Sequence, residues 1–248
     1  MNLISNKAKI GKNLKIGAYT VIKDDVEIGD NVQIANNVVI YEGSKIGDNV
    51  RIDDNVVIGK QPLRAVNSIF QNENKEEPAI IEDNCLIGTS AVIYANSRIE
   101  KDVLIADLAT VRENVSIGTR TIIGRNVTIE NKSQIGSNCK LETNSYISAY
   151  SSVDDYAFIA PGVVTTNDNF LGRTKERFKH FQGVSVKKGG RIGANATILP
   201  GKTINIDTVV AAGSLVTKDT PPKKIVMGSP ARIYKTVPRE QLLENQDK

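Results

Sequence analysis

The chain has few of the residues that usually perform redox or metal chemistry. It contains no tryptophan, one histidine (His180), two methionines and two cysteines among its 248 residues. A single histidine excludes in practice a zinc hydratase, which needs several histidine ligands. We therefore expect no metal site.

Long apolar runs and a strong net charge are also missing. No run of about 18 apolar residues is present, so we expect no membrane span. The first twenty residues lack the apolar core and small-residue cleavage site of a signal peptide. With 32 basic and 28 acidic residues the net charge is +4, and no basic stripe is interleaved with aromatics, as nucleic-acid binding would need. These absences predict a soluble cytoplasmic protein without a nucleic-acid partner.

What the chain does have is a six-residue period. Between Ile81 and Ile159, every sixth residue is aliphatic, and eleven of the fourteen are isoleucine. This period fits neither an amphipathic helix nor an alternating strand. It is typical of the hexapeptide β-helix, in which each short flat side places one bulky residue inward. Two positions before many of these residues comes a small one, as in Cys85, Ala91 and Ser97, and a narrow prism has room for one of each.

The same period runs from Ile10 to Ile58 and from Val186 to Val216. The three blocks give 29 sides, or about ten turns, of an all-β parallel helix whose hand the spacing leaves open. Cys85 and Cys139 fall in one column three turns apart, roughly 14 Å. A disulfide needs Cα atoms within about 7 Å, so we expect two buried thiols.

Corner residues recur with the period. Asparagine or aspartate tolerates the left-handed backbone that a sharp corner requires. We interpret the glycines that follow the inward isoleucines in the same steric way. The predicted corners are Asn13, Asp25, Asn31, Asn37, Asn49 and Asn55, and the glycines are Gly11, Gly17, Gly29, Gly47 and Gly59.

The phase breaks twice, which predicts two inserted loops, 60–79 and 165–184. Long loops on a rigid scaffold are more often functional than ornamental. We predict a β-helix domain at 1–217 and a C-terminal extension at 218–248. In the extension, residues 227–233 should be extended or irregular. Pro238 should begin a short helix that reaches Asn245, with Leu242 and Leu243 on its apolar side.

Two passages resemble the bacterial nucleotide-sugar N-acyltransferases. They are Ala160–Phe170 (APGVVTTNDNF) and Gly193–Gly201 (GANATILPG), the latter followed by AAGSLVTKD and MGSPARI. The resemblance implies a left-handed β-helix and a homotrimer with sites between neighbouring prisms. It also implies transfer of an acetyl or other short acyl group from acyl-CoA to the amine of a dTDP- or UDP-linked amino sugar.

The resemblance also implies roles for individual residues. The carboxylate–amide pair of the family matches Glu130 and Asn131, and its loop-opening motif matches Thr166, Asn167 and Asp168, with Arg173 as the basic residue after it. The backbone amides that hold the pantetheine arm match Ala194 and Ala212. The cationic residues near the CoA phosphates match Lys224 and Arg232.

The residues themselves favour an amine acceptor. A hydroxyl needs a strong base such as histidine, whereas an amine needs less help, and the one histidine lies in a loop. Outward carboxylates are the other candidates: we predict Glu130 and Asp107 as catalytic and Glu142 as substrate-binding. Glu130 could instead form a surface ion pair with Arg112, and such pairs contribute little stability.

The first loop supplies one more candidate. Arg64 could contact the pyrophosphate or base of the nucleotide, since arginine binds phosphate in a bidentate manner. Two alternatives stay open: an O-acetyltransferase that uses His180, and a non-catalytic β-helix scaffold.

Overall fold

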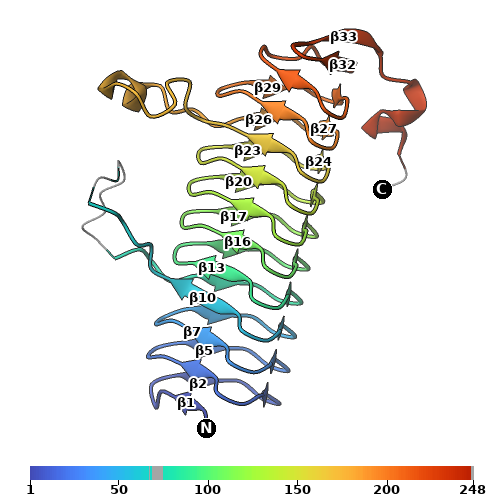
Figure 1. Cartoon of the computed structure of the whole chain (residues 1–248). Helices are drawn as coiled ribbons and strands as arrows, with labels where there is room; N and C mark the ends of the chain where they lie inside the picture. Colours follow the sequence, from blue (N-terminus) through green and yellow to red (C-terminus); the bar gives the residue numbers. More distant parts are fainter. Residues whose placement is uncertain (67, 69–74, 247–248) are drawn as a thin grey trace. The chain divides into compact units, whose positions relative to one another are not determined.

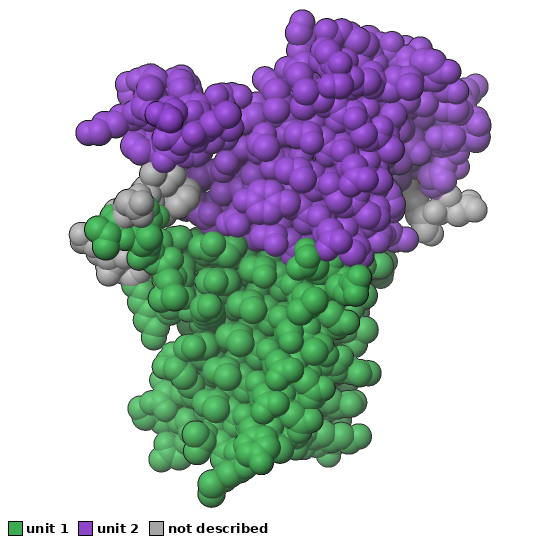
Figure 2. All heavy atoms as spheres, in the orientation of Figure 1, with its two compact units in different colours: residues 1–126 green, residues 127–248 purple. Residues whose placement is uncertain are grey.

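The computed structural model describes residues 1–66, 68 and 75–246. These residues form two compact units, Met1–Asn126 and Val127–Lys248, shown in green and purple in Figure 2. The predicted division at residue 217 stays a prediction.

Unit 1 is a coil of parallel strands of two to four residues, three to a turn (Figure 1). Its three sheets run β1-β4-β7-β10-β13-β16, β2-β5-β8-β11-β14-β17 and β3-β6-β9-β12-β15-β18. The strands are β1 (Leu3–Ile4), β2 (Lys9–Ile10), β3 (Lys15–Ile16), β4 (Val21–Ile22), β5 (Glu27–Ile28), β6 (Gln33–Ile34), β7 (Val39–Ile40), β8 (Lys45–Ile46), β9 (Arg51–Ile52), β10 (Val57–Lys60), β11 (Ile80–Ile81), β12 (Leu86–Ile87), β13 (Val92–Tyr94), β14 (Arg98–Ile99), β15 (Leu104–Ile105), β16 (Thr110–Val111), β17 (Ser116–Ile117) and β18 (Ile122–Ile123).

Unit 2 continues with the same construction in sheets β19-β22-β25-β28-β31, β20-β23-β26-β29 and β21-β24-β27-β30-β32-β33. Its strands are β19 (Thr128–Ile129), β20 (Gln134–Ile135), β21 (Lys140–Leu141), β22 (Tyr146–Ile147), β23 (Ser152–Val153), β24 (Phe158–Ile159), β25 (Val164–Thr165), β26 (Ser185–Val186), β27 (Arg191–Ile192), β28 (Thr197–Ile198), β29 (Thr203–Ile204), β30 (Val209–Val210), β31 (Leu215–Val216), β32 (Lys224–Gly228) and β33 (Ala231–Thr236).

The six-residue period is confirmed as the core. In most rungs one aliphatic side chain points inward and stacks on its equivalent in the next turn, as Ile40 does on Ile22 and Ile58. Ile40 and Ile58 are fully buried, and stacking of like side chains is how parallel rungs exclude water. The two cysteines are free and buried, as predicted. Burial raises the pKa of Cys85 to about 11, so this thiol is unreactive at neutral pH.

The corner prediction is confirmed for asparagine and aspartate, and needs correction for glycine. All six predicted corner residues have φ between +56° and +60°. Gly29, in contrast, lacks a positive φ. A Cβ there would lie 2.8 Å from the Gly47 backbone carbon and closer still to Asp48, so glycine is required for close approach of the next turn. The same holds at Gly11, Gly17 and Gly47, and only Gly59 has a positive φ (+78°).

The number of turns is slightly higher than predicted. The described residues form 33 strands, and the four beyond the 29 predicted sides are β1, β25, β32 and β33. Strand β25 corrects the start of the second loop. Thr165 is still in phase, points inward and is 1% exposed, so the loop leaves the coil at Thr166.

The C-terminal extension differs in detail from the prediction. Residues 227–233 belong to an antiparallel hairpin of β32 and β33. In place of one helix there are two 3-10 turns, η2 (Arg239–Gln241) and η3 (Leu243–Asn245), and Pro238 lies before η2. Leu242 is buried as expected and Leu243 is half-buried. A separate 3-10 helix, η1 (Lys175–Lys179), lies in the second loop.

Candidate functional site

Each turn has three corners, and two of them carry the candidate residues. We call the corner after β10, β13 and β16 in unit 1, and after β19, β22 and β25 in unit 2, the loop edge, because both inserted loops leave from it. We call the corner after β27 and β30 in unit 2 the amide edge. Figure 1 shows the first loop leaving from β10 and the second leaving before β26.

The loop edge of unit 1 is built around a buried carboxylate that the sequence did not single out. The Glu113 side chain has no exposed surface. Its Oε1 accepts a hydrogen bond of 2.5 Å from Arg64 Nη2, and its Oε2 accepts one of 2.9 Å from Arg112 Nε. Desolvation alone would raise the pKa of Glu113, but the hydrogen bonds from Arg64 and Arg112 outweigh it and hold the pKa below its usual value. Glu113 therefore stays ionised and fixes the base of the first loop.

Tyr94 extends this cluster. Arg112 lies over its ring at 4.8 Å from the centroid and Lys60 at 5.4 Å, both within cation–π range. The predicted nucleotide contact, Arg64, is 13% exposed in its side chain. Its guanidinium is engaged by Glu113, which gives it a loop-fixing role. Contact with a nucleotide stays a prediction, and much of the loop beyond Arg64 lies outside the described residues.

In unit 2 the loop edge carries the predicted carboxylate–amide pair. Glu130 is half-buried, and its backbone N–H donates to Ile147 O. Asn131 is 3% exposed, and its carbonyl accepts from Tyr150 N at 3.2 Å. Within the described part of the chain, the side-chain amide of Asn131 has no hydrogen-bond partner. The amide is not one of the fully buried polar atoms that lack a partner, so its atoms remain within reach of solvent or a ligand.

A network of hydroxyl groups connects the turns that follow this pair in the sequence. Thr165 Oγ1 accepts from Ser148 N at 2.7 Å and contacts Ser148 Oγ at 3.0 Å. Ser151 Oγ donates to Ser148 O at 2.7 Å and accepts from Val184 N at 3.1 Å. Because Thr165 and Val184 are the two roots of the second loop, this network holds both ends of the loop on the coil.

Asp168 organises the second loop from within. Its carboxylate accepts from Phe170 N (2.8 Å), Gly172 N (3.0 Å) and Arg177 Nη1 (3.1 Å). Desolvation opposes ionisation, yet these hydrogen bonds lower the pKa of Asp168 overall. The cation paired with Asp168 is thus Arg177, whereas the predicted Arg173 is exposed.

Asn167 and His180, also predicted from the sequence, lie in the same loop. Asn167 is half-buried, and its carbonyl accepts from Gln182 N. His180 is exposed, stacks on Phe170 at 5.8 Å and has its Nε2 3.3 Å from Glu176 Oε1.

Asp107 and Glu142 lie away from the loop edge. Asp107 follows β15, and its Oδ1 accepts from Thr89 N at 2.9 Å. Asn36 and Asp54 cap the preceding turns of unit 1 at the same corner, so the Asp107 carboxylate has a structural partner. Glu142 follows β21 and is half-buried. A catalytic role for Asp107 and substrate binding by Glu142 stay predictions.

The amide edge lacks these caps. Ala194 and Ala212 occupy the corner position whose backbone N–H, in unit 1, donates to a side-chain oxygen one turn further along. One turn beyond Ala194 the residue is Ala212, whose side chain has no acceptor. Among the described residues, neither N–H has a hydrogen-bond partner, although the Ala194 carbonyl accepts from Gly213 N. Two successive corners thus present backbone donors to a ligand.

The C-terminal hairpin adds cationic residues. Lys224 Nζ donates to Thr236 Oγ1 at 2.7 Å, and Arg232 is exposed. Arg232 helps to line a hollow of about 240 Å³ whose other walls include Lys218, Val226 and Ile233.

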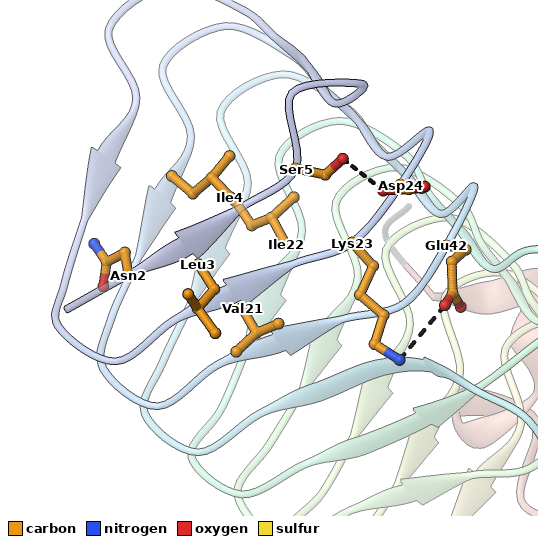
Figure 3. A pocket seen from close by; sticks show the side chains of 9 residues that line it. All are labelled: Asn2, Leu3, Ile4, Ser5, Val21, Ile22, Lys23, Asp24 and Glu42. Atoms are coloured by element: carbon orange, nitrogen blue, oxygen red, sulfur yellow. Dashed lines mark hydrogen bonds and ion pairs between the residues drawn. The ribbon is translucent and has the colours of Figure 1, made fainter.

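A larger hollow lies at the first turn of unit 1, away from all predicted site residues (Figure 3). It measures about 580 Å³ and has a Lys23–Glu42 ion pair on one wall. In this first turn the inward Ile4, which lines the hollow, and Ile10, which does not, are 45% and 41% exposed, because no earlier turn among the described residues covers them. This hollow reflects the open end of the coil.

Among residues 1–66, 68 and 75–246 no cluster of three metal-ligating side chains occurs. No helix in this part is long and apolar enough to cross a membrane.

Family comparisons agree with the repeat. The bacterial transferase hexapeptide (six repeats) profile matches residues 7–42, 25–60 and 96–131. The hexapeptide repeat of succinyl-transferase profile matches 78–97 and 114–149. Together they cover residues 7–60 and 78–149, half of the chain. The chain belongs to the hexapeptide-repeat transferase family.

Curated relatives match over short stretches. A dTDP-3-amino-3,6-dideoxy-alpha-D-galactopyranose 3-N-acetyltransferase of Aneurinibacillus thermoaerophilus is 50% identical over 48 residues, 19% of this chain and 25% of that protein. A 2,3,4,5-tetrahydropyridine-2,6-dicarboxylate N-acetyltransferase of Clostridium perfringens is 54% identical over 46 residues, 18% of this chain and 20% of that protein. The matches thus span a quarter or less of these two relatives.

Solved structures match over nearly the whole chain. An Arabidopsis UDP-N-acetylglucosamine acyltransferase superposes with a TM-score of 0.66 at 15% identity, covering 95% of this chain and 72% of that one. The Francisella novicida UDP-N-acetylglucosamine acyltransferase gives 0.53 at 22% identity, covering 97% and 70%. At this identity the likeness shows the fold, which is the left-handed parallel β-helix that the family resemblance implied.

Proposed function

We propose that the chain is an N-acyltransferase that moves an acetyl or other short acyl group from acyl-CoA to the amine of a dTDP- or UDP-linked amino sugar. Membership of the transferase family and the short match to a dTDP-amino-sugar N-acetyltransferase support this proposal. In unit 2, the structure adds two edges with complementary chemistry.

The observation that carries the proposal is the pair of uncapped N–H groups at Ala194 and Ala212. An extended pantetheine arm carries amide carbonyls that can accept from successive corners. Neighbouring turns lie ~4.8 Å apart, which suits a ligand running along the coil. Arg232 and Lys224, on the hairpin that follows, would neutralise the CoA phosphates.

In this proposal the amino-sugar substrate, which accepts the acyl group, binds at the loop edge. The half-buried Glu130 carboxylate can bind the incoming ammonium and take up its proton as the amine attacks the thioester carbon. The Asn131 amide can donate to a sugar hydroxyl or to the developing oxyanion. The C–S bond then breaks, and the CoA thiolate, a good leaving group, takes the remaining proton. No metal is needed for this chemistry.

The two edges belong to different corners of one triangular coil. A side of six residues separates corners by roughly 15–20 Å, so one copy of unit 2 does not bring Asn131 next to Ala194. A groove between two copies can do so when the loop edge of one faces the amide edge of the other. This geometry favours the homotrimer that the family resemblance implies.

The test is thiol release from acetyl-CoA in the presence of a panel of dTDP- and UDP-linked amino sugars. We expect release that depends on at least one of them, with an acylated amine identified by mass spectrometry. Absence of acceptor-dependent release across the panel, with longer acyl-CoA donors included, would refute the proposal.

A further inference from the structure

The corner positions of the coil nearly always need a positive φ, and most of them carry asparagine, aspartate or glycine. In the column of the loop edge in unit 1, these residues are Asp25 after β4, Gly43 after β7, Asn96 after β13 and Asn114 after β16. Two consecutive turns of unit 2 depart from this pattern. Lys132 has φ +60° and Tyr150 has φ +64°, a conformation that disfavours side chains of this size.

The two residues contact each other beside the proposed acceptor site. Lys132 Nζ lies 5.5 Å from the centroid of the Tyr150 ring. Lys132 directly follows Asn131, whose carbonyl accepts the Tyr150 N–H. Lys132 is exposed, and Tyr150 is 38% exposed. An ammonium group is thus held over an aromatic ring on the residue that directly follows Asn131.

We infer that Lys132 and Tyr150 form the subsite for the diphosphate of a nucleotide-linked acceptor. The Lys132 ammonium pairs with a phosphate oxygen. The Tyr150 ring is a positioning group that holds the ammonium, and the Asn131 amide contacts the sugar next to the phosphate. This inference rests on the proposed function for the identity of the ligand.

The chemistry of the site favours this ligand over a neutral sugar. A neutral sugar would be served by amides and hydroxyls, whereas a phosphate oxygen is best served by a cationic side chain. Arg64 and Arg112 in unit 1 are already bound to Glu113. Lys132 has no carboxylate partner among the described residues, so its charge is available to an anion.

The experiment measures calorimetric affinity for dTDP and UDP in the wild type and in Lys132→Asn, Lys132→Arg and Tyr150→Asn. We expect at least a tenfold loss for Lys132→Asn and Tyr150→Asn, and a change within threefold for Lys132→Arg, which keeps the charge. Neither asparagine variant should lower Tm, because asparagine suits the corner. The matched control is Tyr19→Asn, which makes the same substitution at φ +59° on another corner and should leave the affinity unchanged.

The inference is overturned if the wild type binds neither nucleotide, if both asparagine variants bind as tightly as the wild type, or if Lys132→Arg loses as much affinity as Lys132→Asn. Thiol release separates this result from the proposed function. Nucleotide binding that depends on Lys132 without any acyl transfer would sink the proposed function alone. Acyl transfer with unchanged nucleotide affinity in the variants would sink the subsite alone.

Discussion

At the scale of single residues, corner conformation has a measurable energetic consequence. Leu108 sits at a corner with φ +62° and is 52% exposed. Asparagine tolerates this conformation better, so Leu108→Asn should raise the free energy of unfolding by about 0.5–1 kcal/mol. The reverse change at the equivalent corner of an earlier turn, Asn55→Leu (φ +60°), should lower it by a similar amount. Denaturant unfolding of both variants measures the effect, and equal stabilities would contradict the strain argument.

The buried Glu113 predicts a specific acid dependence. Its pKa is lowered in the folded state, so its contribution to stability is present above about pH 4.5 and is lost as the pH falls through the folded pKa. Glu113→Gln removes the charge that binds Arg64 and Arg112, and should cost about 1–3 kcal/mol at neutral pH.

Measuring unfolding of both proteins between pH 7 and pH 3 checks this linkage. The difference in unfolding free energy between wild type and Glu113→Gln should shrink below pH 4.5. A difference that stays constant over this range would show that the Glu113 ion pairs do not titrate with folding.

The sequence predicted the corner residues but not the Glu113 cluster, and the difference has a physical reason. Whether Asn31 or Asn49 sits at a corner depends only on the local period, because left-handed φ is a property of one residue. The Arg64–Glu113 pair joins residues from an irregular loop and a rung two turns later. No periodic signal specifies which column such a loop folds back on. Lys132 and Tyr150 lie at corner positions where most turns have asparagine, aspartate or glycine, so the sequence pattern marks them as exceptions once the energetic preference for those residues is taken into account.

At the scale of elements, the second loop depends on Asp168. Its carboxylate binds two backbone N–H groups and Arg177, whereas the neighbouring Lys179–Glu176 pair is well exposed. Asp168→Ala should increase chymotryptic cleavage at Phe170, Phe178 or Phe181 about tenfold, equivalent to ~1.4 kcal/mol of easier local opening. Lys179→Ala is the control and should change cleavage by less than twofold, since exposed ion pairs contribute little. Equal cleavage of the two variants would mean that Asp168 does not hold the loop.

The loop boundaries show how far element-level prediction from sequence extends. The sequence predicted both inserted loops, because the spacing between inward aliphatic residues stops being a multiple of six at each of them. Thr165 was assigned to the second loop because the aliphatic period stops at Ile159 and resumes only at Val186. Thr165 nevertheless occupies an inward position, and its hydroxyl accepts from Ser148 N. The C-terminal helix was expected from Pro238 and two leucines, but the segment is too short to propagate a helix and forms 3-10 turns.

At the scale of the whole molecule, the proposed function depends on two edges meeting. The backbone donors of the amide edge can be removed without changing the loop edge. Pro161 occupies the same corner position as Ala194 one turn earlier. There Ala160 N donates to Ile192 O, and Pro161 O accepts from Asn195 N. Ala194→Pro with Ala212→Pro should therefore remove two N–H donors with little disturbance of the coil. The double variant should raise the KM for acyl-CoA at least tenfold and leave the affinity for the nucleotide unchanged.

Subunit complementation tests the central claim most directly. Asn131→Ala disables the loop edge, and the Ala194→Pro, Ala212→Pro double variant disables the amide edge. When the two chains are co-expressed and purified as mixed oligomers, we expect acyl transfer to exceed that of either parent oligomer severalfold, because some grooves pair an intact loop edge with an intact amide edge. Mixed oligomers no more active than the parents, or an active wild-type monomer, would contradict a site shared between copies.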